Sequence, residues 1–285
     1  MSTHKTEFLL GVLGCPVAHS RSPAMHNAAL QAKGIEGFYG RFEVAAESLT
    51  EAMRGLRALG IHGVNVTVPH KETVRSLLDE VDAIATRIGA VNTIFRDRDR
   101  LVGTNTDARG LVRALERAEV AIEGARVVVI GAGGAARAAA VGLTEAGAAT
   151  VQIAARRPEQ AQALLQDYQA LSAIDPTPVS LLDLKSCMAH CDLLVQATSA
   201  PLQGPKEAAA FADALPLDHL PQAAVVIDLV YEPLETQVLA AARRLGLKTV
   251  DGLGMLLYQG AIAFETWFGG EGAPVDIMRA ALQRG

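Results

Sequence analysis

The sequence predicts an α/β protein with two domains, each built around a mainly parallel β-sheet. The chain has 285 residues, a length that corresponds to roughly two domains. Short β-branched segments alternate with longer helical ones, which is the order that parallel strands joined by crossover helices require. Apolar residues make up 50% of the chain and aromatic residues only 4%, and this abundance of small side chains favours helices packed closely on a sheet.

The charge and composition argue against several other classes of protein. The formal net charge is −5, whereas a nucleic-acid partner rewards clustered Lys and Arg. No uncharged apolar stretch reaches the ~18 residues that a membrane span needs, and the N-terminal segment lacks the apolar core of a secretory signal. The 3 cysteines of the chain are too few for a disulfide framework. We therefore expect a cytoplasmic protein that binds neither nucleic acid nor a membrane.

The first part of the chain shows strand and helix signals in alternation. Strands are expected at 8–13, 38–44 and 64–68, with a hairpin formed by 90–96 and 100–104. Helices are expected at 23–33, 48–59 and 72–87. The first of these helices has Ser22 as its expected N-cap, Pro23 at its first position and Gly34 just past its end.

The second part of the chain continues the alternation. Strands are expected at 126–130, 151–155, 193–196 and 224–228. Helices are expected at 108–118, from a glycine-rich loop to 146, and at 159–171, 252–268 and 275–284. We place a nucleotide-binding domain at 108–251 and a first domain at 1–107, to which the C-terminal residues 252–285 are expected to return.

A glycine-rich turn follows the strand at 126–130 and has the form of a dinucleotide-binding fingerprint, Gly131-x-Gly133-x-x-Ala136. The first glycine permits a tight turn, the second lets main-chain N–H groups approach a pyrophosphate, and the small alanine lets helix and strand pack closely. A tight turn without a ligand is the alternative. The β-branched strand before the motif and the Ala-rich helix after it favour the dinucleotide site.

The end of the next strand indicates which dinucleotide would bind. An NAD site usually offers an acidic residue about 20 residues past the glycines, where it holds the ribose 2′-hydroxyl. This chain has Arg156 and Arg157 there, and the first acid to follow is Glu159. Guanidinium groups attract the 2′-phosphate of NADP, although two solvated arginines would give the same pattern. NADP is the expected cofactor.

One strand of the first domain ends in polar residues. Asn65 and Thr67 share the face opposite a row of valines, and Lys71 lies just past the strand end. In open α/β sheets, ligands gather outside the carboxyl ends of strands, which is where this lysine would lie. Taken alone, the three could equally be solvent-facing side chains and a charge at a helix start.

Four further polar residues have plain structural explanations when each is taken alone. Asp107 suits the N-cap of the helix at 108–118, and Ser20 and Ser22 suit a turn and a cap. Gln259 lies within an apolar helix, where a buried amide needs a hydrogen-bond partner.

The segment Cys187-Met-Ala-His190-Cys191 offers three soft metal ligands in a short stretch. Nothing elsewhere in the sequence supplies an obvious pair of ligands that would complete a zinc site. We therefore expect no metal and interpret the segment as a helical surface or core element.

Taken in order, these segments resemble the motifs of the shikimate dehydrogenase family, and the resemblance covers nearly the whole chain. The matching segments are Ser20-Arg-Ser22-Pro, Asn65-Val-Thr67-Val-Pro-x-Lys71, Ala90-Val-Asn92-Thr, Thr104-Asn-Thr-Asp107, Gly131-Ala-Gly133-Gly134-Ala135, Asp228-x-x-Tyr231-x-Pro and Asp251-Gly252-Leu-Gly-Met255-Leu-x-x-Gln259. The turn that binds NADP in the family is commonly Asn-Arg-Thr, and here it is Ala155-Arg156-Arg157.

The resemblance implies an N-terminal substrate domain, a Rossmann domain for NADP, and the reversible reduction of 3-dehydroshikimate to shikimate in aromatic amino acid biosynthesis. It implies that Lys71 and Asp107 are catalytic, with the lysine transferring the proton. Substrate contacts are implied for these two residues and for Ser20, Ser22, Asn65, Thr67, Asn92, Tyr231 and Gln259. Cofactor contacts are implied for Gly131, Ala132, Gly133, Gly134, Ala135, Arg156, Arg157, Thr198, Leu229, Gly252 and Met255.

Two alternative functions stay open at this point. Other members of the family oxidise quinate, which carries one more hydroxyl beside the carboxylate, so Ser20 and Ser22 should sense the difference. A non-catalytic NADP-binding sensor of the same fold is the second alternative, and the presence of both Lys71 and Asp107 counts against it. The sequence is compatible with a monomer or a homodimer.

Overall fold

The computed structural model describes residues 7–155, 177–179, 184–202, 204–270 and 272–284. The chain divides into two compact units. Unit 1 consists of residues 1–106 and 257–285, and unit 2 consists of residues 107–256. The sequence prediction placed this division at 107/108 and 251/252. Within the described residues, every helix is too short or too polar to cross a bilayer.

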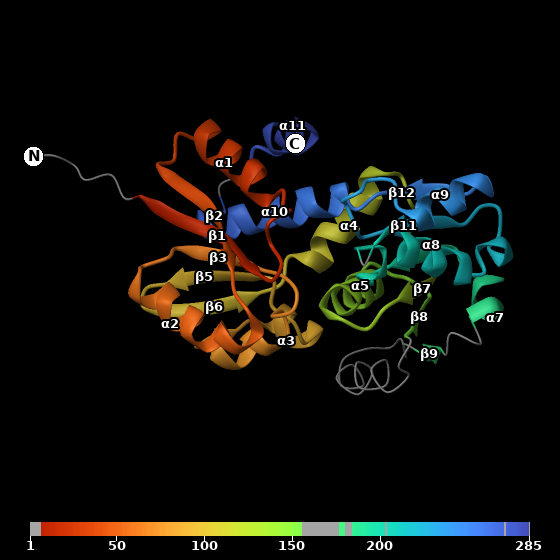
Figure 1. Ribbon diagram of the computed structural model, residues 1–285, viewed down its shortest axis with the longest axis horizontal. Helices are drawn as coiled ribbons and strands as arrows, with labels where there is room; N and C mark the ends of the chain where they lie inside the picture. The colour runs from red at the N-terminus through yellow and green to blue at the C-terminus, as the bar shows by residue number, and fades with distance from the viewer. Residues whose placement is uncertain (1–6, 156–176, 180–183, 203, 271, 285) are drawn as a thin grey trace, which may run out of the picture. The chain divides into compact units, whose positions relative to one another are not determined.

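Unit 1 is built on a six-stranded mixed sheet of order β2-β1-β3-β5-β6-β4 (Figure 1). Its strands are β1 (Phe8–Gly14), β2 (Gly37–Glu43), β3 (Gly63–Val66), β4 (Glu80–Val81), β5 (Thr93–Asp97) and β6 (Arg100–Thr104). Strands β2 and β3 each pair with β1 in parallel. Strand β5 runs antiparallel to both β3 and β6. The carboxyl ends of β1, β3 and β6 therefore lie at one edge, together with the start of β5.

Helices cover both faces of this sheet (Figure 1). They are α1 (Ser22–Ala32), α2 (Leu49–Ala58), α3 (Ala83–Ile88), α10 (Leu253–Trp267), which begins in unit 2, and α11 (Val275–Arg284), with 3₁₀ turns η1 (Ala46–Ser48) and η2 (Thr73–Leu77). The apolar side of α2, formed by Leu49, Met53 and Leu56, shares a core with Val64 and Val66 of β3. The C-terminal helix α11 packs on α1, so the C-terminal residues belong to the first compact unit.

Unit 2 is a doubly wound parallel sheet of order β12-β11-β10-β7-β8-β9. Its strands are β7 (Arg126–Ile130), β8 (Thr150–Ala154), β9 (Thr177–Val179), β10 (Leu193–Gln196), β11 (Val225–Asp228) and β12 (Lys248–Val250). Its helices within the described residues are α4 (Asp107–Arg117), α5 (Gly134–Glu145), α7 (Leu184–Met188), α8 (Pro205–Ala214) and α9 (Gln237–Arg244), with η3 (Ala200–Leu202) and η4 (Leu217–His219). Counted along the chain, this is the 3-2-1-4-5-6 order of a Rossmann domain, with its switch point between β7 and β10.

The predicted α/β class with two mainly parallel sheets is confirmed, and the helix expected at 72–87 is wrong. That segment forms η2, the short strand β4 and α3 instead. Two acidic side chains interrupt the helix because one binds a main-chain group of strand β6 and the other caps a separate short helix. Asp79 Oδ2 accepts a hydrogen bond from the main-chain N of Leu101 at 2.7 Å. Asp82 Oδ1 accepts one from Ala85 N at 2.8 Å, which caps α3.

Two predicted helix caps are also wrong. Helix α1 begins at Ser22 itself, with Arg21 in the cap position and no side-chain capping bond. Helix α4 likewise begins at Asp107, which is its first residue and not the residue before it. The strand expected at 64–68 ends at Val66, and Asn65 is buried where its alternation with valine suggested a solvent-facing side. The helix expected at 159–171 lies outside the described residues.

Close packing between β3 and α10 depends on the absence of a side chain at Gly63. The indole N–H of Trp267 donates to the main-chain oxygen of Ile94 at 2.9 Å. A Cβ added at Gly63 would overlap the indole ring and lie 2.8 Å from that same oxygen. Neither neighbour can move without breaking the hydrogen bond.

We expect Gly63→Ala to lower the free energy of unfolding by about 1–3 kcal/mol, because overpacking forces the Trp267 ring from its place. The matched control is Gly55→Ala, on helix α2, where an added Cβ has no neighbour within 4 Å. That substitution should raise the free energy of unfolding by about 0.5–1 kcal/mol. Urea unfolding of both variants makes the comparison, and equal effects would contradict the packing at Gly63.

Candidate functional site

Buried polar side chains form a hydrogen-bonded cluster at the edge of the unit 1 sheet where β1, β3 and β6 end and β5 begins. Asn92, which directly precedes β5, accepts a hydrogen bond through Oδ1 from Thr106 N at 2.8 Å. Its Nδ2 donates to Thr106 Oγ1 at 2.9 Å. Asn65 Nδ2, on β3, donates to Thr93 Oγ1 at 3.1 Å and to the main-chain oxygen of Asn92 at 3.3 Å. Because buried polar groups are costly unless paired, these bonds fix the ends of three strands together.

Gln259 of α10 also belongs to this cluster. Its side-chain amide can be buried in an apolar helix because it is paired with Asn92. Asn92 Nδ2 lies 3.4 Å from Gln259 Oε1, and both side chains are buried. The structure thus brings together Asn65, Asn92 and Gln259, which the sequence selected separately. Thr93 and Thr106 complete the cluster. Both lie within quoted motifs, but neither was predicted as a site residue, because its role depends on strand pairing.

Lys71 and Thr67 lie just past β3 at the same edge. Thr67 N donates to the main-chain oxygen of Leu13 at 2.9 Å, which continues the pairing with β1. The main-chain oxygen of Lys71 accepts from Val91 N at 2.7 Å. The lysine backbone is therefore bound to the residue next to Asn92, and its side chain is half-buried.

Ser20 and Ser22 stand where the chain leaves β1 and enters α1. Ser22 is buried and Ser20 half-buried, and Ser20 Oγ accepts a hydrogen bond from Ser22 N at 3.3 Å. The guanidinium of Arg41 donates to the main-chain oxygen of Ser20 at 2.7 Å, which ties this segment to β2. Since β1 and β3 are parallel, both serines follow the same edge of the sheet as Lys71.

In unit 2, the glycine-rich loop connects β7 to α5 at the switch point of the sheet. Gly131 has φ +124°, a conformation that favours glycine, and a Cβ there would lie 3.1 Å from the main-chain oxygen of Ala197. Gly133 has an ordinary φ of −84°, and a Cβ there would meet nothing within 4 Å. Gly131 therefore shapes the loop, whereas Gly133 leaves open space before the N-terminus of α5. Ala136 is fully buried, as close packing requires. Main-chain N–H groups at the start of a helix favour an anion in such a position.

The ends of the neighbouring strands β10 and β11 are linked by a buried carboxylate. Asp228 Oδ1 accepts hydrogen bonds from Gln196 Nε2 at 3.1 Å and Val230 N at 3.0 Å. Its Oδ2 accepts from the hydroxyl of Thr236 at 2.6 Å. Burial raises the pKa of this carboxyl above its usual range, and the three hydrogen bonds oppose that effect. Gln196 Oε1 in turn accepts from Thr198 N at 2.6 Å.

This network holds the segments that carry the predicted cofactor residues Thr198 and Leu229. A Cβ at Gly252 would lie 2.5 Å from the main-chain oxygen of Leu229, so glycine is needed there for the two segments to meet. Met255 is buried, and Tyr231 is half-buried. The remaining predicted residues are Asp107, which is the buried first residue of α4, and Arg156 and Arg157, which lie outside the described residues.

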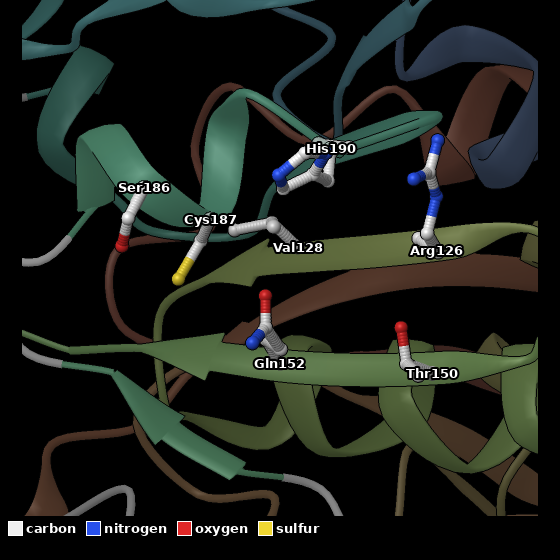
Figure 2. Close-up of a pocket in the computed structure, with 8 residues that line it drawn as sticks. Arg126, Val128, Thr150, Gln152, Ser186, Cys187 and His190 are labelled. Carbon is white, nitrogen blue, oxygen red and sulfur yellow. The ribbon is translucent and has the colours of Figure 1, made fainter.

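A separate pocket opens on unit 2 between β7, β8 and α7. Figure 2 shows Gln152 of β8 and Cys187 of α7 reaching toward the same space. The pocket is lined by Arg126, Val128, Thr150, Gln152, Ser186, Cys187, His190 and Cys191, none of which is a predicted substrate or cofactor residue. Burial raises the pKa of the Cys191 thiol to about 12, so it stays protonated and is a poor metal ligand. Among the described residues no group of side chains has the arrangement of a metal site.

Comparison with known families accounts for most of the chain. The model described as "Shikimate dehydrogenase substrate binding domain" matches residues 12–94. The model described as "Shikimate / quinate 5-dehydrogenase" matches residues 113–252. The model described as "Shikimate 5'-dehydrogenase C-terminal domain" matches residues 252–283. The first match lies in unit 1, the second in unit 2, and the third covers the C-terminal residues, most of which belong to unit 1.

Individual relatives are similar over nearly their whole length. The shikimate dehydrogenase (NADP(+)) of Symbiobacterium thermophilum is 46% identical over 96% of this chain and 92% of its own. A shikimate 5-dehydrogenase of Thermus thermophilus, solved with NADP(H) and shikimate, is 38% identical with a TM-score of 0.83 over 97% and 99% of the two chains. The quinate dehydrogenase of Corynebacterium glutamicum, solved with NAD, is 33% identical with a TM-score of 0.86 over 98% and 100%.

The two glycines of the loop give a prediction that separates folding from binding. Gly133→Ala should leave the melting temperature unchanged, because the added methyl group meets only open space. It should raise the Kd for NADP about five- to hundredfold, since the methyl group would obstruct a pyrophosphate that approaches the main chain. Fluorescence titration measures this Kd.

The matched control is Gly131→Ala, which should lower the melting temperature because of its positive φ and the nearby Ala197 oxygen. An unchanged Kd for NADP in a folded Gly133→Ala variant would contradict the site.

Proposed function

Because the chain belongs to the shikimate dehydrogenase family, we propose that it catalyses the NADP-dependent, reversible reduction of 3-dehydroshikimate to shikimate. The observation that carries the proposal is the cluster of buried amides at one edge of the unit 1 sheet, Asn65, Asn92 and Gln259, with Lys71 beside it. Neutral amides held in fixed orientations suit a small ligand that carries several hydroxyl groups.

We assign the substrate carboxylate to Ser20 and Ser22. Their hydroxyl groups can donate hydrogen bonds to an anion, and the main chain around them is tied down by Arg41. Ring hydroxyls are assigned to the three buried amides and to two further polar side chains, one in each unit. These five residues are Asn65, Thr67, Asn92, Tyr231 and Gln259.

The proton of the reaction is assigned to Lys71. NADPH, when bound, supplies the hydride that reaches the carbonyl carbon of 3-dehydroshikimate. Reduction then needs one proton at the carbonyl oxygen, and the ammonium Nζ of Lys71 is a donor that can supply it. In the reverse direction the amine takes the hydroxyl proton back. Asp107 is assigned to orient the ammonium and the reacting hydroxyl.

We place NADP on unit 2. Gly131, Ala132, Gly133, Gly134 and Ala135 form the loop before α5 and its first turn, where main-chain N–H groups can bind the pyrophosphate. Arg156 and Arg157 are assigned to the 2′-phosphate. Thr198, Leu229, Gly252 and Met255 are assigned to the nicotinamide side, next to the Asp228 network. Cytoplasmic action as a monomer or homodimer completes the proposal.

The proposed function is tested by turnover with shikimate and quinate, each offered with NADP and NAD. We expect shikimate with NADP to give the highest kcat/KM, because the similar curated relatives are shikimate dehydrogenases and because two arginines attract the 2′-phosphate. A hydrogen bond to a charged group contributes about 1.5–3 kcal/mol, so each arginine should favour NADP by roughly ten- to a hundredfold. A higher kcat/KM with quinate would favour a quinate dehydrogenase. Absence of turnover with every pair would favour the non-catalytic NADP-binding sensor.

We expect Lys71→Ala to lower kcat for shikimate oxidation by about 10²–10⁴, the usual effect of removing a positioned acid–base group, with a smaller change in KM. Steady-state kinetics of NADPH formation measures both constants. Lys33→Ala is the matched control, because this exposed lysine follows α1 in the same unit. Near-wild-type kcat in a folded Lys71→Ala variant would remove the lysine from the mechanism.

A further inference from the structure

Asn65 has a buried partner that belongs to none of the motifs singled out in the sequence. The hydroxyl of Tyr39, on the edge strand β2, donates to Asn65 Oδ1 at 2.8 Å, and both residues are buried. Tyr39 has 0% of its surface exposed, so it cannot contact a substrate itself. Its hydroxyl can act on the site through the Asn65 amide that it binds.

The orientation of that amide follows from its other partner. The main-chain oxygen of Asn92 can only accept a hydrogen bond, so the Asn65 atom 3.3 Å from it must be the nitrogen. Thr93 Oγ1 gives its proton to Asn92 Oδ1 at 3.0 Å and therefore accepts the second N–H of Asn65. Both N–H groups of Asn65 are thus used inside the protein. Its Oδ1, which receives the Tyr39 hydroxyl, keeps a second lone pair.

Tyr39 is itself held from two sides. Its main-chain N donates to Asn27 Oδ1 at 2.8 Å, and Asn27 Nδ2 donates to its main-chain oxygen at 2.9 Å. Its ring stacks on that of His26, with centroids 4.4 Å apart and planes 13° from parallel. The centroid of the Trp267 ring lies 6.0 Å from that of Tyr39. Burial lowers the pKa of His26 to about 3, opposed by the nearby Asn65 side chain, so the imidazole is neutral at physiological pH. His26 therefore packs on the Tyr39 ring as a neutral group.

We propose that Tyr39 is a positioning residue that makes Asn65 a hydrogen-bond acceptor toward the substrate. Because both N–H groups of Asn65 are occupied, the side chain can bind a ring hydroxyl, which donates, and has nothing to offer a ring carbonyl or fluorine at the same carbon. This inference rests on the proposed function and adds to it a specificity for one non-reacting hydroxyl of the ring. Loss of the Tyr39 hydroxyl would release Oδ1 and blur that preference.

The test compares Tyr39→Phe with wild type on shikimate and on analogues that lack one of the two non-reacting ring hydroxyls. For shikimate we expect kcat/KM to fall about three- to tenfold, mainly through KM, as for loss of one neutral hydrogen bond. For one of the deoxy analogues the two proteins should be equal, because Asn65 then has no hydroxyl to accept from. A merely structural role would lower kcat/KM by the same factor for every substrate and would overturn the proposal.

Two further variants complete the experiment. Asn27→Ala removes the side chain that binds the main-chain N and O of Tyr39. It should show the same dependence on one hydroxyl, so it serves if Tyr39→Phe does not fold. Tyr258→Phe is the control, because that buried tyrosine of α10 binds Arg279 at 2.8 Å and lies outside the group of residues that bond to Asn65. Its kinetics should match wild type.

The direction of the hydrogen bond is tested on the wild-type enzyme. At the hydroxyl that the variants identify, fluorine should be no better than hydrogen, since fluorine cannot donate. A fluoro analogue with a much higher kcat/KM than the deoxy analogue would overturn the acceptor role of Asn65. Absence of wild-type turnover would overturn the proposed function and this inference together, whereas normal turnover with an unaffected Tyr39→Phe variant would overturn only the inference.

Discussion

The requirement that buried amides be paired determines much of unit 1. Asn92 takes part in hydrogen bonds with Thr106 and Gln259 and, through its main-chain oxygen, with Asn65. An unpaired amide in that position would cost several times the net contribution of one hydrogen bond, so the segments that supply the partners cannot shift independently. Strands β3, β5 and β6 and helix α10 are tied in this way, and Lys71 is carried along through its main-chain bond to Val91.

Unit 2 has the strand order and glycine-rich loop by which Rossmann domains bring main-chain N–H groups close to a pyrophosphate. In open α/β sheets ligands bind at the switch point, which here lies at the carboxyl ends of β7 and β10, and two glycines have different roles there. Gly131 permits the turn, and Gly133 keeps the space before α5 open. The buried Asp228 then fixes the adjoining segments through Gln196 and Thr236, although burial makes its charge costly.

The parts of the fold that could be predicted from the sequence are those set by local chemistry and periodicity. The strand at 126–130, the helix at 275–284 and the hairpin strand at 100–104 have their predicted bounds, whereas the first hairpin strand, predicted at 90–96, begins at Thr93. The segment 72–87 was not predicted correctly, because Asp79 bonds to Leu101, which is distant in sequence. The sequence also did not predict a role for the hydroxyls of Tyr39, Thr93 and Thr106. Their partners come within reach when β2, β5 and β6 pair in the sheet.

The chemical character of the cluster follows from where it lies. An ionised side chain buried at that position would need a compensating charge, whereas amides and hydroxyls need only hydrogen bonds. Asn65, Asn92 and Gln259 are neutral, and His26 behind them is neutral because burial disfavours its charged form. Recognition of ring hydroxyls can then be precise in direction without altering the electrostatic potential at the neighbouring lysine. The charged groups of the proposed reaction are then Lys71, assigned to move the proton, and Asp107, assigned to orient the lysine.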